Sequence, residues 1–424
     1  MQRSDIRAVG ELAGEASTVL TALVRGMHSG IATRVFNSIG PSAAPTRTIH
    51  DGISGAIYTG VDRGLRGASR VAGLVASEIW GNEVDEPLES RSDSVGAFLA
   101  AVNGIYGDEL ADHENPLAGA MVVRHDGRSV ALTSEALAAA YPAATGRVVV
   151  FVHGWCMTER AWSRAPRETD DGRSYGERLH EELGYSPILL RYNSGLHISV
   201  NGRTMADILE LLHAHWPVPV TELVLVGHSM GGLVARSACH YGTEQEHAWT
   251  DDVTRVVCLG SPHLGADLEK GVNIAAWALA KLPETRAIAD FLNARSDGVK
   301  DLRFGACLDE DWLDADPDEF LRDRCGEAPF LPHATYHYVS TTVSPRLLGL
   351  LAGDHLVRTK SATGVGKTRL VPFAAEQGLI LTGLNHFDLL NHPLVYAKLR
   401  AWLSQSVALP AGVGDTRRHV GGDG

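Results

Sequence analysis

The sequence lacks a long apolar run. No stretch reaches the roughly 18 uncharged apolar residues that a membrane-spanning helix needs. We also expect no secretory signal, because Arg7, Glu11, Glu15 and Arg25 interrupt the apolar segment 6–25. We therefore expect a cytoplasmic protein, with peripheral attachment to a membrane or lipid surface as the open alternative.

Basic residues and cysteines are scarce as well. Lys and Arg number 38 against 51 Asp and Glu, which gives a formal net charge of −13. A protein that binds nucleic acid by neutralising phosphates needs the opposite balance, so we expect no nucleic-acid partner. The five cysteines are an odd number, which favours reduced thiols. A Cys307–Cys325 disulfide is the alternative if the protein is exported.

Two N-terminal segments have helical hydrophobic spacing. Apolar residues recur every three or four positions over 6–25 and 50–80, and the breaker GPSAAP (40–45) lies between them. This pattern predicts a helical hairpin within an N-terminal helical region, 1–110. The hairpin is expected either to pack on the following domain or to offer residues 6–80 to a lipid surface or a partner. The oligomeric state is left open.

A sheet is predicted to begin near residue 119. The segment AMVVRHDGRSVALT (120–133) has two short β-type runs around Asp126-Gly127, which is a common hairpin turn. Buried-type strands then alternate with amphipathic helices. The expected strands are 147–152, 186–192, 222–227, 255–260 and 335–343, and the expected helices lie near 173–183, 203–216, 230–241 and 392–403.

Apolar runs without polar alternation, separated by helices, are typical of a parallel sheet covered on both faces. The sequence therefore predicts an α/β fold with a doubly wound, mostly parallel sheet in a domain spanning 111–405. A helical insertion, 266–333, interrupts the alternation and is predicted to act as a lid over the site. Residues 406–424 have the composition of a disordered tail.

The pentapeptide GHSMG (227–231) points to a nucleophile. It fits G-x-S-x-G, and Ser229 stands directly after a predicted strand and before a predicted helix. Glycines on both sides allow a strained turn and close packing around it. We interpret Ser229 as a catalytic nucleophile; the alternative is a small residue in a tight structural turn.

A serine nucleophile needs an acid and a base, which follow it in that order along this type of chain. Asp354 in LAGDHLVRT is the expected acid. The acidic run 309–319 offers alternative carboxylates, which we interpret as a solvent-exposed surface of the insertion. His386 in TGLNHFDLLNHP is the expected base. His392 stands directly before Pro393 and is expected to cap the last helix.

Two backbone amides should stabilise the oxyanion of the tetrahedral intermediate. The first is that of Met230, and the second is that of Trp155 in VFVHGWCM (150–157). His153 and Gly154 precede Trp155, and they are expected either to line the pocket or, for His153, to be structural. A polar loop, RYNSGLHISVNGR (191–203), follows another strand, so Asn193, Ser194 and His197 are expected at the pocket entrance or in a hydrogen-bonded surface loop.

Together these motifs resemble the α/β-hydrolase superfamily, in particular its bacterial lipase and esterase branch with deacylase-like members. The resemblance covers roughly residues 119–403 and rests on HGW, GHSMGG, GSPHLG (260–265), GDHLV and NHFDLLNH. GSPHLG is similar to the Gly-Thr-Pro-His motif of many lipases, with Ser261 in place of Thr. Its His263 is therefore expected beside the substrate pocket.

The resemblance implies a serine hydrolase that cleaves carboxylic esters, of lipids or other acyl compounds, through an acyl-enzyme and without a metal or organic cofactor. Two alternatives remain open. The same residues would serve an acyltransferase, and a hydrolase fold without activity would serve as a binding protein.

Overall fold

The computed structural model describes residues 3–39, 44–80, 93–163, 172–266, 285–314, 323–342, 359–366 and 369–405, with parts of 269–281 and 316–319. The strands are β1 (Val122–His125), β2 (Arg128–Val130), β3 (Arg147–Val152), β4 (Ser186–Arg191), β5 (Glu222–His228), β6 (Val253–Leu259), β7 (Thr335–Thr342) and β8 (Gly378–Thr382). The longer helices are α1 (Arg3–Ile39), α2 (Ala44–Trp80), α3 (Asp93–Asp112), α5 (Tyr175–Leu183), α6 (Ile198–His215), α7 (Met230–Glu244), α9 (Arg286–Asn293) and α12 (Pro393–Leu403).

The strands form one sheet in the order β2-β1-β4-β3-β5-β6-β7-β8. The β1–β2 and β1–β4 pairs are antiparallel, and all neighbours from β4 to β8 are parallel. Asp126 and Gly127 both have positive φ, 45° and 75°, as the right-handed twist of a two-residue hairpin requires. The predicted α/β class and the predicted hairpin are therefore confirmed.

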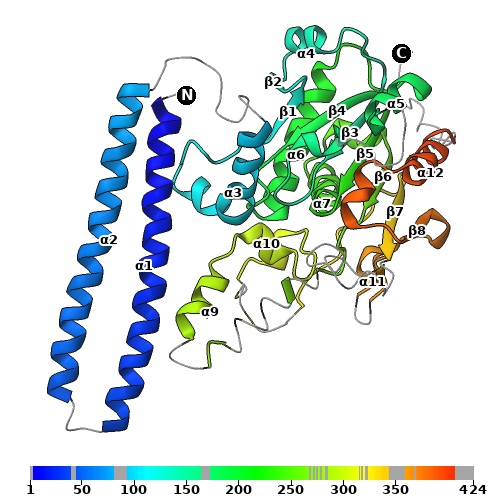
Figure 1. Cartoon of the computed structure of the whole chain (residues 1–424). Coiled ribbons are helices and arrows are strands. Elements are labelled where there is room, and N and C mark those ends of the chain that lie inside the picture. The colour runs from blue at the N-terminus through cyan, green and yellow to red at the C-terminus, as the bar shows by residue number, and fades with distance from the viewer. Residues whose placement is uncertain are drawn as a thin grey trace, which may run out of the picture.

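Helices cover both faces of the sheet (Figure 1). Alternate residues of β3 belong to two separate cores: Val148 and Val150 pack in one with residues of α6 and α7. Val149 and Phe151 pack in the other with residues of α5 and α12. This two-sided burial explains why the strand sequences are apolar throughout.

The N-terminal hairpin is present, and it is longer than predicted. Helices α1 and α2 run side by side away from the sheet (Figure 1). They approach so closely that a Cβ on Gly10 would lie 2.8 Å from the Cα of Gly73. Thr18 Oγ1 also donates to Asp62 Oδ1 at 2.6 Å. None of the helices in the described ranges has the length and apolarity needed to cross a bilayer.

The insertion contributes α9 and the short helix α10 (Asp297–Asp301), and α9 packs against α1. Helix α9 lies in the insertion that the sequence predicted to be helical; residues 273–282 of the insertion are only partly within the described residues. The tail 406–424 lies outside them. All five cysteines are free thiols, so Cys307 and Cys325 do not pair.

Candidate active site

Ser229 occupies a sharp turn between β5 and α7. Its backbone has φ 53° and ψ −122°, a region that residues with a side chain rarely adopt. The Ser229 amide donates to Leu259 O at 2.8 Å, and the Gly232 amide donates to Ser229 O at 3.1 Å. These bonds hold the strained turn from both sides, and Ser229 stands at the N-terminus of α7, where the helix dipole favours negative charge.

The flanking glycines are required by close backbone contact. A Cβ on Gly227 would lie 2.4 Å from the carbonyl carbon of Gly231, and a Cβ on Gly231 would lie 2.2 Å from Val152 O. No side chain can move aside to relieve these clashes, because the neighbouring atoms are backbone. The sequence pattern around Ser229 therefore follows from the packing of α7 against β3 and β5.

We predict that Gly231→Ala disrupts this turn. The added methyl group should cost about 3 kcal/mol or more in the free energy of unfolding, since the backbone must move. Denaturant unfolding measures this loss. Gly119→Ala is the matched control, because its Cβ would lie 3.5 Å from the nearest atom, Asn103 Oδ1. Equal stability of the two variants would contradict the account.

His386 begins the 3₁₀ helix η8 (His386–Leu390) and lies beside His228, the residue before the serine. The two imidazole centroids are 4.6 Å apart, and His228 Nε2 is 3.0 Å from His386 O. Because a carbonyl oxygen only accepts, His228 Nε2 must carry its proton, which fixes the tautomer. Burial, and then the neighbouring His228, hold the pKa of His386 well below its usual value. Burial also lowers the pKa of His228, to about 4, so both rings are neutral at pH 7.

Among the described backbone–backbone hydrogen bonds outside helices and strands, none has the amide of Trp155 or of Met230 as its donor. The loop after β3 approaches the nucleophile closely: a Cβ on Gly154 would lie 3.1 Å from Ser229 Cβ. Two bonds fix this loop. Trp155 Nε1 donates to Gly104 O of α3 at 2.7 Å, and the Cys156 amide donates to Ser194 Oγ at 3.0 Å.

Ser229 and His386 line one cavity of about 450 Å³, a volume within the range of small-molecule sites. Gly154 and Trp155 line it too. The walls are otherwise mostly apolar and come from α3, the loops after β3 and β6, the insertion and η8. Their residues are Ala97, Cys156, Met157, Thr158, Ala161, Pro262, Ala266, Leu302, Phe387 and Leu390, together with His228.

The predicted acid, Asp354, lies outside the described residues. Within the described part, no carboxylate is hydrogen-bonded to the His386 ring. Asp388, the nearest acid along the chain, accepts from the Asn385 amide at 2.9 Å and so caps η8. His392 Nδ1 accepts from the Leu394 amide and caps α12, as predicted.

Three predicted pocket residues are placed elsewhere. His153 is fully buried and stacked on Tyr192, and burial lowers its pKa to about 4. Asn193 is buried and donates to Gly107 O of α3 at 2.8 Å. His263 is buried against Arg236, whose Nη1 lies 3.1 Å from its Nδ1. None of the three lines the cavity. Their contacts support the loops that do line it. Residues of a motif that follows a strand can thus pack beneath a site as well as within it.

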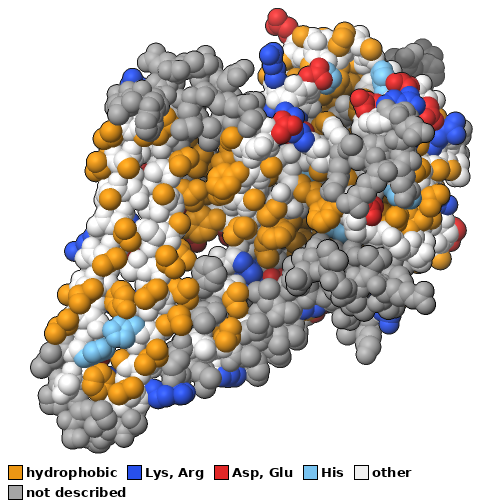
Figure 2. Space-filling model, in the orientation of Figure 1, with side chains coloured by type: hydrophobic (Ala, Val, Ile, Leu, Met, Phe, Trp, Pro, Cys, Tyr) orange, Lys and Arg blue, Asp and Glu red, His pale blue; other side chains and the backbone are white. Residues whose placement is uncertain are grey.

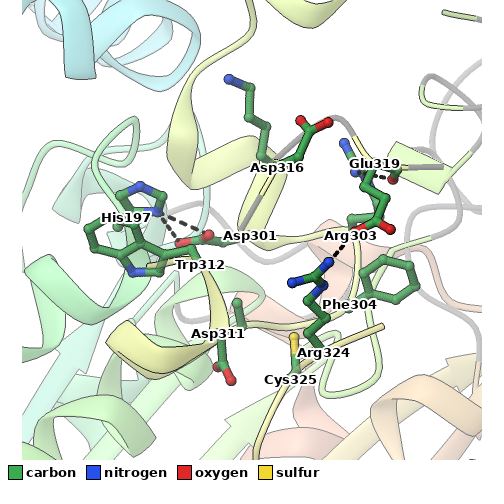
Figure 3. A pocket seen from close by; sticks show the side chains of 12 residues that line it. His197, Asp301, Arg303, Phe304, Asp311, Trp312, Asp316, Glu319, Arg324 and Cys325 are labelled. Carbon is green, nitrogen blue, oxygen red and sulfur yellow. Dashed lines mark hydrogen bonds and ion pairs between the residues drawn. The ribbon is translucent and has the colours of Figure 1, made fainter. Parts of the chain in front are cut away.

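His197 lines a different and smaller pocket, of about 60 Å³, formed with the insertion (Figure 3). Its ring stacks on Trp312 with centroids 3.8 Å apart, and its Nδ1 lies 3.1 Å from both carboxylate oxygens of Asp301. Its Nε2 lies 3.3 Å from Asp297 Oδ2. His197 therefore ties the loop after β4 to α10.

The charge of His197 should contribute to stability. Burial alone would lower the pKa of its imidazole, but hydrogen bonds to Asp297 and Asp301 raise it to about 9. Because this folded-state value exceeds the unfolded value of about 6.5, the stabilisation is complete below pH 6.5 and is lost as the pH rises through 9.

We expect His197→Gln to lose on the order of 2 kcal/mol of unfolding free energy below pH 6.5, and the difference from the wild type to shrink toward pH 9. Unfolding curves at several pH values measure it. Trp312→Phe removes the indole but not the ion pairs, so its loss should not vary with pH. A pH-independent difference for His197→Gln would contradict the assignment.

Sequence reasoning missed the contribution of α3 to the cavity, and it named no single wall residue of the insertion. Ala97 and Leu302 lie far from the motifs along the chain, and no local pattern marks them. Phe387 and Leu390 could have been found, because they directly follow His386. Within the described ranges, no group of three or more His, Cys, Asp or Glu side chains is placed to hold a metal ion.

Comparison with family models gives one match to part of the chain. The model of the family described as the PGAP1-like alpha/beta domain matches residues 143–276, the segment from β3 to the start of the insertion. None of the curated protein sequences compared with the chain matches it.

Among solved structures, the chain is similar to the mature lipase BlEst2 of Bacillus licheniformis, with 21% identity, 61% of this chain and 91% of that chain covered, and a TM-score of 0.38. It is similar to a thermophilic esterase from Thermogutta terrifontis, with 16% identity, 61% and 90% coverage and a TM-score of 0.33. It is also similar to a lipase-esterase related protein from Clostridium acetobutylicum, with 13% identity, 61% and 95% coverage and a TM-score of 0.32.

Proposed function

We propose that this chain, a member of the α/β-hydrolase superfamily, is a serine hydrolase that cleaves carboxylic esters through an acyl-enzyme. The observation that carries the proposal is one cavity that joins the strained Ser229 turn, the His386 ring and the loop of Trp155. We assign the activity to residues 111–405, with 1–110 as an N-terminal helical region. We further propose that the insertion 266–333 covers the site, since Ala266 and Leu302 form part of the cavity wall.

In the proposed reaction, His386 takes the proton of the Ser229 hydroxyl as the oxygen attacks the ester carbonyl. The developing oxyanion accepts hydrogen bonds from the Trp155 and Met230 amides. His386 then gives its proton to the departing alcohol, which leaves an acyl group on Ser229. Water, deprotonated by the same imidazole, cleaves this acyl-enzyme. Asp354 is the residue we propose to hold the imidazole in the productive tautomer.

The cavity walls favour an apolar acyl group. Met157, Leu302, Phe387 and Leu390 all face the space beside Ser229, and they offer no charge to bind an ionic substrate. The limited volume of about 450 Å³ favours chains of intermediate length over very long ones.

Hydrolysis of p-nitrophenyl esters from acetyl to palmitoyl tests the proposal, together with labelling of the full chain by a fluorophosphonate. We expect labelling, and a kcat/KM that rises from acetyl toward intermediate chains and falls at palmitoyl. Product analysis with an added alcohol separates hydrolysis from acyl transfer. A chain that neither binds the label nor turns over any ester would refute the proposal and favour a binding protein.

A further inference from the structure

Helix α2 carries an exposed apolar stripe that no other described element covers. Its members are Ile57, Val61, Gly64, Ala68, Val71 and Val75, which follow one another at intervals of four and three residues. All six are exposed; Ile57 and Val71, for example, are 58% and 59% exposed. Intervals of four and three place residues on one side of a helix, in the pattern by which helices pack together.

The opposite side of α2 is already occupied. Asp62 accepts from Thr18 of α1, and Gly73 packs against Gly10. The stripe contains no charged residue, so no charge must be desolvated when it is covered. The hairpin therefore has a second packing surface in addition to the one that joins its own two helices.

The stripe is symmetric about residue 66. Ile57 and Val75 are equally distant from it, as are Val61 and Val71, and Gly64 and Ala68. In a two-fold contact each residue of one copy meets its counterpart on the other. An antiparallel pair of α2 helices would thus place large residues against large ones at both ends, and the small residues Gly64 and Ala68 together at the centre.

We propose that α2 packs antiparallel against α2 of a second copy of this chain, with the two-fold axis near Gly64 and Ala68. Small residues at the crossing allow the two backbones to approach closely. Valine and isoleucine at the ends then fill the space between the helices.

The surface is large enough for a stable dimer. Figure 2 shows apolar side chains along both helices of the hairpin. Helix α2 has 37 residues. One face of it, about 55 Å long and about 10 Å wide, presents about 550 Å², so a pair of copies buries about 1,100 Å² in total, which exceeds the roughly 1,000 Å² expected of a specific interface.

The composition favours a second copy over a lipid surface. Helices that lie on membranes are rich in Lys and Arg on the polar face and carry Trp, Phe or Leu on the apolar face. Residues 1–80 contain no Lys, and the charge of their eight Arg is largely balanced by six Asp or Glu. The stripe itself contains only Ile, Val, Gly and Ala.

Gly64→Leu tests the contact without damaging the monomer. A Cβ at Gly64 meets no atom within 4 Å, and leucine favours the helix more than glycine does, so the hairpin should remain folded. The added side chain would keep the two helices apart. We expect sedimentation equilibrium to give a dimeric wild type and a dimer weakened about 100-fold or more in Gly64→Leu.

Gly52→Leu is the matched control. Gly52 is an exposed glycine of the same helix whose Cβ also meets no atom within 4 Å, and it lies off the stripe. This variant should remain as dimeric as the wild type. A monomeric wild type, or a Gly64→Leu variant that dimerises like Gly52→Leu, would overturn the proposal. Binding of a monomeric wild type to vesicles of phosphatidylcholine and phosphatidylglycerol would assign the stripe to a lipid surface instead.

The antiparallel register has its own test. Single variants Ile57→Cys and Val75→Cys, mixed and treated with a short bifunctional maleimide, should cross-link to each other. Neither should cross-link to itself, because two copies of either position would lie about 27 Å apart along the axis. Self-linking of Ile57→Cys would indicate a parallel pair and overturn the register; the wild type controls for Cys156 and Cys325. These outcomes do not depend on ester hydrolysis.

Discussion

Ser229→Ala should lower kcat for ester hydrolysis by about 10⁴ to 10⁶-fold and abolish labelling by a fluorophosphonate. The Ser229 hydroxyl is the only nucleophile that the protein supplies in the proposed scheme, and the remaining oxyanion donors can supply only a small residual rate. The turn itself should survive, because it is held by the backbone bonds from Ser229 to Leu259 and from Gly232 to Ser229. Initial rates and the labelled fraction measure the effect on the same preparation.

Ser237→Ala is the control for the loss of a serine from α7. Its Oγ donates to Cys307 O at 2.6 Å and is buried away from the cavity. Loss of that bond should cost about 1 kcal/mol of stability and leave labelling unchanged. If Ser229→Ala still binds the label, another residue is the nucleophile, and the proposed mechanism is wrong.

The sequence predicted the sheet well, and for a physical reason. Strands buried on both faces must be apolar throughout, so β3 agrees with its predicted range at both ends and β5 differs by one residue. Strand β8 (Gly378–Thr382) was not predicted. It is short, lies at the edge of the sheet and is only half buried, so its sequence carries neither a long apolar run nor clear alternation.

The site was predictable where chemistry restricts the backbone. A sequence motif identifies Ser229 and Gly231, because the turn tolerates so few residue types at these positions. No motif identifies the residues of the pocket walls, since any apolar side chain of suitable size can fill them. His153 and His263 follow strands as active-site residues do, yet the structure buries both beneath the loops. Burial of this kind depends on long-range packing, which a local motif does not encode.

Substitution of His386 should lower the rate of ester hydrolysis nearly as much as substitution of Ser229. His386→Gln is expected to lower kcat about 10⁴-fold or more, since glutamine cannot accept the proton of Ser229. His386 lies in the cavity wall beside Ser229, so substrate binding should change little while the chemical step fails. Single-turnover kinetics measure substrate binding and the chemical step separately. Unchanged acylation in His386→Gln would contradict its role as base.

Asp354→Asn tests the remaining member of the proposed triad through the pH profile. Burial and His228 hold the pKa of His386 well below its usual value, whereas a carboxylate partner would raise it. Since the neutral imidazole is the active form, removal of the Asp354 charge should move the acid limb of kcat/KM to lower pH, in addition to a loss of about 10⁴-fold in rate. Asp388→Asn should neither shift the acid limb nor lower the rate, because the asparagine side chain can still accept the hydrogen bond from the Asn385 amide. An acid limb that does not move in Asp354→Asn would mean that another carboxylate orients His386, and the acidic run 309–319 would be the next place to test.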